Sequence, residues 1–213
     1  MTLYSLCPLS EDRGHNERRG EAIIMKGQDI VILLKLFCLN EREFVWSSED
    51  ETLTTDYGSP YSVRNLAASL GISKTEVAAS LNRSLDSGLA TIDQSFRRTK
   101  PNRRDLFNFI VYGLKFVFPA KLGAPERGIP TGFSAPMLQG LIISPSQDVY
   151  IWPNEYGMER GLSIVPLFNS VPVAVQSDPE LYRLLALIDA IRLGRQREAN
   201  LAAEQLKKRL VKQ

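Results

Sequence analysis

Histidine, cysteine and long apolar runs are all scarce in this sequence of 213 residues. The only histidine, His15, lies in a polar N-terminal stretch, which excludes most histidine-based catalytic sites. The two cysteines, Cys7 and Cys38, have neither metal-ligand spacing nor a disulfide framework, as is usual in a reducing cytoplasm. The longest apolar run, residues 30–39, contains Lys35 and is too short to cross a bilayer. We therefore expect a cytoplasmic protein with no membrane span and no metal site.

The sequence also lacks the usual marks of an enzyme. Its segments "LGISKT" and "YGLKF" do not have the glycine pattern of a Walker or dinucleotide-binding loop. Glu155 and Glu159 lie four residues apart in a proline- and glycine-rich stretch, a pattern more typical of a solvated face than of paired catalytic carboxylates. We predict that the chain is not an enzyme and uses no cofactor.

Charge is distributed unevenly, although the net charge is only +2. Residues 97–104, "RRTKPNRR", hold five basic residues and no acid. The chain from Arg192 onward holds seven basic residues against Glu198 and Glu204, whereas residues 43–56 are acidic. Because overall charge says little about partners, these local runs are the candidates for contact with nucleic acid or acidic proteins.

The N-terminal third of the chain is predicted to contain a tail, a helix and a loop. Residues 1–24 resemble a flexible tail with no secretory signal, and translation could start at Met1 or at Met25. Apolar residues at helical spacing predict a first helix over residues 29–39. Few regular signals follow in residues 40–60, which we interpret as a loop or irregular insertion.

Two short helices with clear boundaries are predicted next. Ser62 can cap a helix that Gly71 ends in the left-handed conformation. Ser73 then caps a second helix, and Glu76 three residues later completes a capping box. Small Ala67, turn Gly71 and apolar Val77 have the spacing that lets one helix cross another in a DNA-binding helix-turn-helix. A short strand over residues 89–92 and the basic run follow.

This segment, "NLAASLGISKTEVAASLNRSLDSGLA" with its strand and basic turn, resembles the winged helix-turn-helix regulators of bacteria and archaea of the type called MarR-like. The resemblance covers roughly residues 29–105 and implies a homodimer that binds inverted repeats near its own promoter. The later stretch "YGLKFVFPAKLGAPERGIPTGFSAP" resembles winged-helix proteins of toxin-antitoxin or defence operons, which would make the second half the binding site for a toxin. Flanking dimer helices of the MarR-like pattern are not obvious here, so the family remains open.

The candidate DNA-binding residues are those that a recognition helix and a basic wing would present to a duplex. Small side chains at the helix surface allow close approach to a groove, and polar or basic ones reach bases and phosphates. An alternative is that the basic run is a solvated loop and the winged helix is a protein-docking module. The candidates are Ser73, Lys74, Thr75, Ala79, Asn82 and Arg83 on the helix, and Arg97, Arg98, Lys100, Arg103 and Arg104 in the wing.

The second half of the chain is predicted in less detail. Residues 105–118 are apolar nearly all round and should form a buried helix or a helix at a subunit interface. Short strands are expected over residues 138–144 and 148–153 in the proline-rich segment 119–177. Asp178 and Pro179 begin a further helix that runs to Gly194, and a basic helix follows as a hairpin partner or an outward extension.

The triplet Glu-Arg-Gly occurs twice in this half, at residues 126–128 and 159–161. Each arginine precedes a glycine that could expose its backbone, so Arg127 and Arg160 together could bind an anion or an acidic partner. Alternatively, each arginine pairs with a neighbouring carboxylate or caps loop carbonyls, and the repeat arises by chance.

Taken together, these patterns predict an α+β, mainly helical chain with three parts. Residues 1–24 form a tail, residues 25–118 a winged helix-turn-helix domain, and residues 119–213 a partner-binding or dimerisation region with short strands and a C-terminal helical pair. The chain is expected to be a cytoplasmic transcriptional regulator that acts as a homodimer. It would bind double-stranded DNA sequence-specifically and repress its own promoter. The alternative is an antitoxin-like winged-helix module that binds a protein partner, such as a toxin, without reading DNA.

Overall fold

The central element of the protein is helix α1, Gly27–Trp46. The computed structural model describes residues 24–46, 59–141 and 148–211, so all but the last residue of the expected tail lies outside the description. Side chains from residue 28 to residue 38 are buried on every side of α1. The sequence predicted a helix only over residues 29–39. Residues 40–46, interpreted as loop, continue the helix instead, and residues 47–58 lie outside the described residues.

Helices α2, Val63–Leu70, and α3, Lys74–Asp86, form a pair joined by a short turn. The Ser62 hydroxyl accepts a hydrogen bond from Asn65 N at 3.2 Å, and the Ser73 hydroxyl accepts one from Glu76 N at 3.2 Å. Gly71 has a φ of 64°, a left-handed conformation that costs glycine little. The caps and the turn therefore confirm the predicted boundaries.

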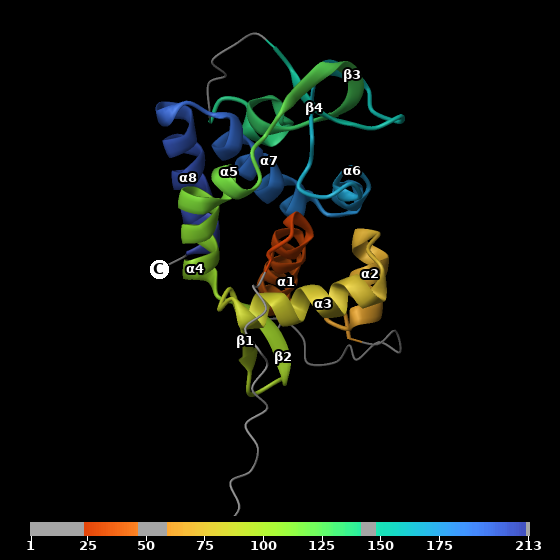
Figure 1. The fold of residues 1–213 in the computed structure, drawn as a ribbon, viewed down its shortest axis with the longest axis vertical. Coiled ribbons are helices and arrows are strands. Elements are labelled where there is room, and N and C mark those ends of the chain that lie inside the picture. The colour runs from red at the N-terminus through yellow and green to blue at the C-terminus, as the bar shows by residue number, and fades with distance from the viewer. Residues whose placement is uncertain (1–23, 47–58, 142–147, 212–213) are drawn as a thin grey trace, which may run out of the picture.

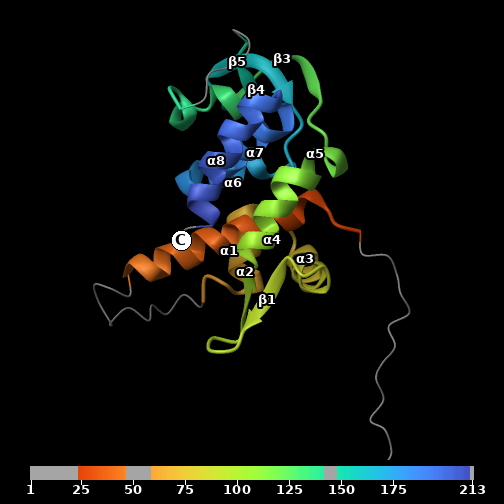
Figure 2. The ribbon, with the colours of Figure 1, turned by 90° about the vertical axis from the view of Figure 1, so that its left-hand side faces the viewer.

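A small antiparallel hairpin follows α3. Strand β1, Ala90–Asp93, pairs with strand β2, Arg98–Pro101, and the hairpin projects from one end of the molecule in Figure 2. The predicted strand over residues 89–92 is thus present, shifted by one residue. The basic run covers the end of the hairpin turn, the second strand and the start of the next helix.

The segment predicted as one helix over residues 105–118 is helical but interrupted. It consists of α4, Arg103–Asn108, a π-helical segment, Phe109–Gly113, and α5, Leu114–Val117. One side of it is buried in the core, whereas Tyr112, Phe116 and Val117 are exposed. The expectation of a fully buried helix is therefore wrong, because only one side of the segment is covered within this chain; a subunit interface stays a prediction.

Three strands form a second, separate sheet in the C-terminal half. Strand β3, Leu122–Pro130, is antiparallel to both β4, Tyr150–Pro153, and β5, Glu159–Ile164, and β4 and β5 are parallel to each other. The predicted strand over residues 148–153 corresponds to β4. The predicted strand over residues 138–144 is wrong where it is described, because residues 138–141 form a 3-10 helix end and a turn. Short 3-10 helices occupy Gly132–Ser134 and Pro136–Leu138.

The chain ends in packed helices. After α6, Val171–Ala174, and the 3-10 helix Val175–Ser177 come α7, Pro179–Leu193, and α8, Gln196–Leu210. Helix α8 folds back along α7, and Figure 1 shows α4 beside this pair. The Asp178 side chain accepts a hydrogen bond from Leu181 N at 3.2 Å and so caps α7 where the sequence predicted its start.

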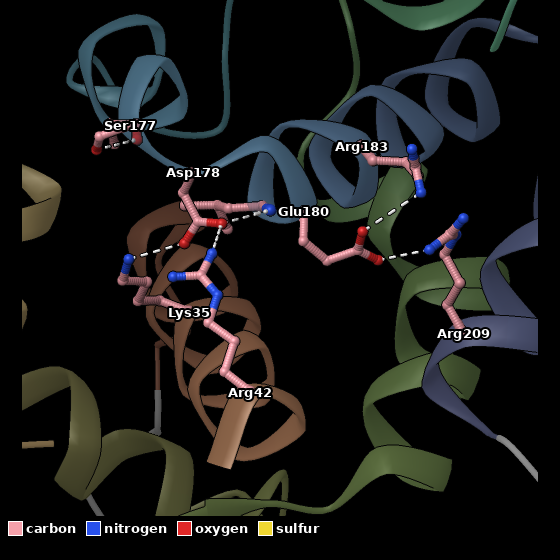
Figure 3. Close-up of polar contacts among 9 residues, drawn as sticks. Lys35, Arg42, Ser177, Asp178, Glu180, Arg183 and Arg209 are labelled. Carbon is pink, nitrogen blue, oxygen red and sulfur yellow. Dashed lines mark hydrogen bonds and ion pairs between the residues drawn. The ribbon is translucent and has the colours of Figure 1, made fainter. Parts of the chain in front are cut away.

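A buried ion cluster joins α1 to α7 (Figure 3). Asp178 has no exposed surface, and one of its carboxylate oxygens accepts a hydrogen bond from Lys35 Nζ at 2.8 Å. The guanidinium of Arg42 binds the other oxygen. Nearby, Glu180 pairs with Arg183 of α7 and Arg209 of α8. The Asp178 contacts fix the C-terminal half to α1, and the Glu180 contacts join α7 to α8.

The architecture is α+β and mainly helical, as predicted. The buried apolar side chains form one continuous cluster that includes residues of α1, α2, α4, α7 and α8. The expected boundary between residues 118 and 119 coincides with the end of α5, but packing of α1 against α7 crosses it. Among the described residues, no helix has the length and apolar character that a membrane span requires.

Candidate nucleic-acid interface

The outward face of α3 carries small and polar side chains. Val77 is fully buried against the core, and this fixes the rotation of the helix. Exposed residues recur at helical spacing on the opposite side, at Thr75, Ala78 and Asn82, with Lys74 in the first turn. Ser73 serves as the N-cap, and Ala79 is half-buried. Ala78, which the sequence analysis missed, lies in the middle of this face, four residues before Asn82.

Arg83 has a different environment from the one expected. Its Nε and NH2 groups donate to the two oxygens of Asp29 at 3.0 and 2.7 Å. Asp29 has no exposed surface and also accepts a hydrogen bond from Lys26 N at 2.8 Å. The hydrogen bonds from Arg83 to this carboxylate raise the pKa of the guanidinium further. Arg83 therefore joins α3 to α1 and does not belong to the outward face.

Glu76 also contacts α1. Its backbone N–H bonds to Ser73, which is half of the predicted capping box. The carboxylate, however, accepts hydrogen bonds from the Gln28 side chain and, at 3.2 Å, from Lys26 Nζ. These bonds lower the pKa of Glu76 below its ordinary value, the contact with Gln28 contributing most. Glu76 thus helps to hold the start of α3 beside the start of α1.

Three basic side chains of the predicted wing are exposed to solvent, two on the hairpin and one on α4. Arg97 is at the end of the turn, with a φ of 50°, and is exposed. Lys100 on β2 is exposed and lies 3.9 Å from a carboxylate oxygen of Asp93, a weak surface contact. Arg104 is exposed in the first turn of α4. These three residues are the part of the predicted basic wing that faces outward.

Arg98 occupies a cage of aromatic and acidic side chains. Its guanidinium carbon lies 3.9 Å from the ring centroid of Tyr61 and 4.6 Å from that of Phe96. It also forms an ion pair with Glu43, and this hydrogen bond lowers the pKa of the glutamate and raises that of the arginine. Arg98 thereby fixes the hairpin against the end of α1 and the start of α2.

Arg103 has a similar bracing role. Its guanidinium lies 2.6 Å from a Glu41 oxygen and 4.8 Å from the ring centroid of Phe37. Both partners belong to α1. Of the seven basic residues predicted to contact DNA, Arg83, Arg98 and Arg103 are therefore engaged with α1 or its surroundings, and the remaining three of the wing join Lys74 as solvent-facing cations.

Apolar side chains are also exposed on the hairpin. Ile92 is 46% exposed and Phe96 is 64% exposed. Beside them a groove of about 360 Å³ runs between the start of α2 and the hairpin, lined by residues that include Val63, Leu81 and Thr99. The sequence did not predict this exposed apolar surface. In so short a strand, the alternation of apolar and polar residues does not indicate which face the rest of the protein leaves uncovered.

Arg127 and Arg160 lie far from this face. They are on β3 and β5, at the end of the molecule opposite to the hairpin (Figure 1). The register pairs them directly across the two strands. The structure thus brings together the two residues that the sequence analysis grouped on the basis of their shared triplet.

Within the described residues, no group of three or more histidine, cysteine or acidic side chains could hold a metal ion. Comparison with known proteins finds no matching family model, no similar curated protein and no similar solved structure. The function is therefore inferred from the geometry of the chain itself.

Proposed function

We propose that this protein is a sequence-specific DNA-binding transcriptional regulator that represses its own promoter. Helix α3 enters the major groove, and the β1–β2 hairpin acts as the wing that contacts the phosphate backbone. The C-terminal half binds a partner or a second copy. The order of three helices followed by a hairpin is that of a winged helix-turn-helix, the fold that the resemblance to MarR-like regulators implies.

The observation that carries this proposal is the outward face of α3. Thr75 and Ala78 are small enough for close approach to base edges, and the Asn82 amide can pair with adenine. Lys74 stands where a phosphate would meet the first turn, and α3 begins with backbone N–H groups that favour an anion. A basic hairpin with Arg97 and Lys100 lies next in the chain.

Binding to an inverted repeat requires two copies whose recognition helices are one helical turn apart. The exposed side chains of Tyr112 and Phe116, 70% and 75% accessible, support a role of the α4–α5 side in dimer formation. This segment starts directly after the wing, so a two-fold axis there would place both wings on one side of the dimer.

A protein-docking module without DNA recognition is the second candidate. It is favoured by the exposed Ile92 and Phe96 on the hairpin, because apolar wing residues suit a protein surface better than a phosphate backbone. The engagement of Arg98 and Arg103 with α1 also reduces the cationic surface.

Fluorescence anisotropy separates the two candidates. The full chain is titrated at near-physiological salt against its own upstream promoter duplex and a scrambled duplex of equal composition. If α3 reads bases, Asn82→Ala costs about 1–3 kcal/mol, roughly 5- to 150-fold, on the promoter duplex only. Arg97→Ala weakens binding to both duplexes and lowers the salt dependence by about one phosphate contact.

Lys208→Ala is the matched control, since it removes an exposed lysine of α8 and should leave both affinities unchanged. Arg83 is unsuitable as a test residue, because its loss would leave the buried Asp29 without its main partner. Equal weak binding of the wild type and Asn82→Ala to both duplexes would overturn the proposal and favour the docking module.

A further inference from the structure

The paired strands β3 and β5 place two arginines side by side. Residues directly opposite in an antiparallel pair project to the same face, with Cβ atoms about 5 Å apart. Arg127 and Arg160 are such a pair, and both are exposed. Neither forms an ion pair with any residue in the described parts of the chain. Like charges in this position are destabilising, so an anionic partner would relieve a repulsion already present.

The acids beside these arginines do not neutralise them. Glu126 and Glu159 each precede an arginine, and successive residues of a strand project to opposite faces. In the register, Glu126 is opposite Gly161 and Glu159 is opposite Gly128. Glu155 lines a hollow of about 550 Å³ with Arg127 but makes no ion pair with it. The strand face that carries Arg127 and Arg160 therefore keeps its positive charge within an otherwise acidic surface.

The glycines of the two triplets have a packing role. A Cβ atom at Gly128 would lie 2.0 Å from the carbonyl oxygen of Trp152, and one at Gly161 would lie 2.2 Å from that of Val149. Glycine is required for this close approach of backbones. The sequence analysis linked the glycines to exposure of the arginine backbone, but Gly128 is buried. Strand packing explains the glycines and leaves the arginines unexplained.

An apolar groove lies next to the arginine pair. Ile129 is two residues from Arg127 on β3 and so projects to the same face, and Met158 lies immediately before β5. Both line a groove of about 430 Å³ whose walls include Tyr156, Val175 and Tyr182. Met158 is 92% exposed and Tyr156 is 81% exposed, which is unusual for large apolar side chains. Charge and apolar surface are thus adjacent on one face.

We propose that this face binds an acidic segment of a partner protein in an extended conformation. One carboxylate of the segment lies between the two guanidinium groups, and an apolar side chain two residues along occupies the groove. In a strand, residues i and i+2 lie about 6.5–7 Å apart on one side, which matches the spacing of Arg127 and Ile129 on β3. This inference rests on the partner-binding part of the proposed function.

Nucleic acid does not suit the same face. Glu155 lines the hollow beside Arg127 and Glu159 borders the adjacent groove, so a chain of successive phosphates along this face would meet carboxylates on either side of the arginine pair. A single carboxylate that the arginines bind as a fork avoids most of those acids. The face also lies at the end of the molecule opposite to the hairpin (Figure 1).

The test is a nuclear magnetic resonance titration of the full chain with a synthetic peptide, acetyl-Gly-Ser-Glu-Thr-Leu-Ser-Gly-amide, in the absence of DNA. We expect saturable shifts of the Arg127 and Arg160 Nε–H signals and of the Met158 methyl signal. Replacing glutamate by glutamine, or leucine by serine, in the peptide should weaken binding at least tenfold. Arg127→Gln and Arg160→Gln should each do the same, without loss of thermal stability because both side chains are exposed.

Arg197→Gln is the matched control, because it removes an exposed arginine of α8 and should not change peptide affinity. Inorganic phosphate and a single-stranded oligonucleotide are the competing probes. Absence of saturable shifts up to about 10 mM peptide, equal binding of the glutamine peptide, or tighter binding of either phosphate probe overturns the inference. Such a result leaves the promoter anisotropy unchanged, so failure here is distinguishable from failure of DNA recognition.

Discussion

Three buried carboxylates hold separate elements of this protein together. Asp29, Asp178 and Asp189 have 0 to 2% of their surface exposed. Asp189 accepts hydrogen bonds from Thr131 at 3.0 Å and from the Trp152 indole at 2.6 Å, and it pairs with an arginine one turn along its own helix. Burial raises the pKa of Asp189 despite these partners. Each of these sites would be costly if one partner were lost, because a buried polar group would remain unsatisfied.

The buried thiol of Cys38 gives a pH dependence with a definite sign. Burial raises the pKa of Cys38 from 9.0 to about 12. Between these values the unfolded chain has lost the proton and the folded chain keeps it, so stability falls as pH rises. The stabilising contribution is fully present below pH 9 and should fall by about 1.4 kcal/mol between pH 8 and pH 10.

Urea unfolding of the wild type and of Cys38→Ala under reducing conditions measures this contribution. All other ionisable groups are present in both chains, so the difference isolates Cys38. The difference in unfolding free energy between the wild type and Cys38→Ala should fall by about 1.4 kcal/mol between pH 8 and pH 10. A difference independent of pH would mean that the thiol ionises in the folded protein as it does in water.

Residue-level prediction from sequence succeeded where the physical cause is local. The caps at Ser62, Ser73 and Asp178 were predictable because each side chain bonds to a backbone N–H three residues away. Arg83 was misplaced because its partner is 54 residues distant in sequence, and Arg98 because its partner is 55 residues distant. A basic residue on a polar helix face has the same appearance in sequence whether it faces solvent or a buried acid.

At the scale of elements, α1 has partners on all sides. Its apolar residues at helical spacing predicted a helix, with no indication that side chains would be buried on more than one face. One side is covered by α7, whose own apolar residues gave no indication of what they pack against. Lys35, predicted only as an interruption of an apolar run, becomes a buried contact to Asp178 at that junction.

Removing different members of the ion cluster at this junction should lower the free energy of unfolding by different amounts. Asp178→Ala leaves Lys35 without its carboxylate and removes the α7 cap, so we expect a loss of about 3–5 kcal/mol. Lys35→Met should cost only about 1–2 kcal/mol, because Asp178 retains Arg42 and the cap. Urea denaturation followed by circular dichroism measures both.

Asp86→Ala is the control for this pair, since Asp86 is exposed on α3 and its removal should change stability by less than about 0.5 kcal/mol. Equal losses in the two cluster variants, or a larger loss in Lys35→Met, would show that the lysine and not the aspartate organises the junction.

Strands were harder to predict than helices. β4 was recognised from its apolar residues, but β3 and β5 were not, because exposed residues dominate them and glycine and proline lower strand propensity. Their glycines permit backbone contact across the sheet, a requirement visible only once the strands are assembled. The repeated triplet was a signal of pairing that the sequence analysis noticed but could not interpret.

At the scale of the whole molecule, both halves share one core. The predicted division at residue 118 follows the change in composition along the chain, whereas the packing of α1 and α7 joins the two sides. Sequence composition reports where the chain becomes rich in proline and glycine. It does not report which helices meet across that point.

A shared core predicts a single cooperative unfolding transition. In a Trp46→Phe chain, Trp152 becomes the only indole, and it reports on the C-terminal half through its bond to Asp189. Its fluorescence and the helical circular dichroism signal should give coincident urea midpoints. Two separated transitions would instead show that the halves unfold as independent domains.

Lys35 and Asp178 are 143 residues apart in sequence, and this separation also matters while the protein is being synthesised. At roughly 5–20 residues per second, a ribosome needs about 7–30 s to add α7 after α1 has been made. During that interval the buried apolar residues of α1 lack the partner that covers one side of them. A newly made chain is therefore most prone to aggregate, and most dependent on chaperones, until α7 has been synthesised.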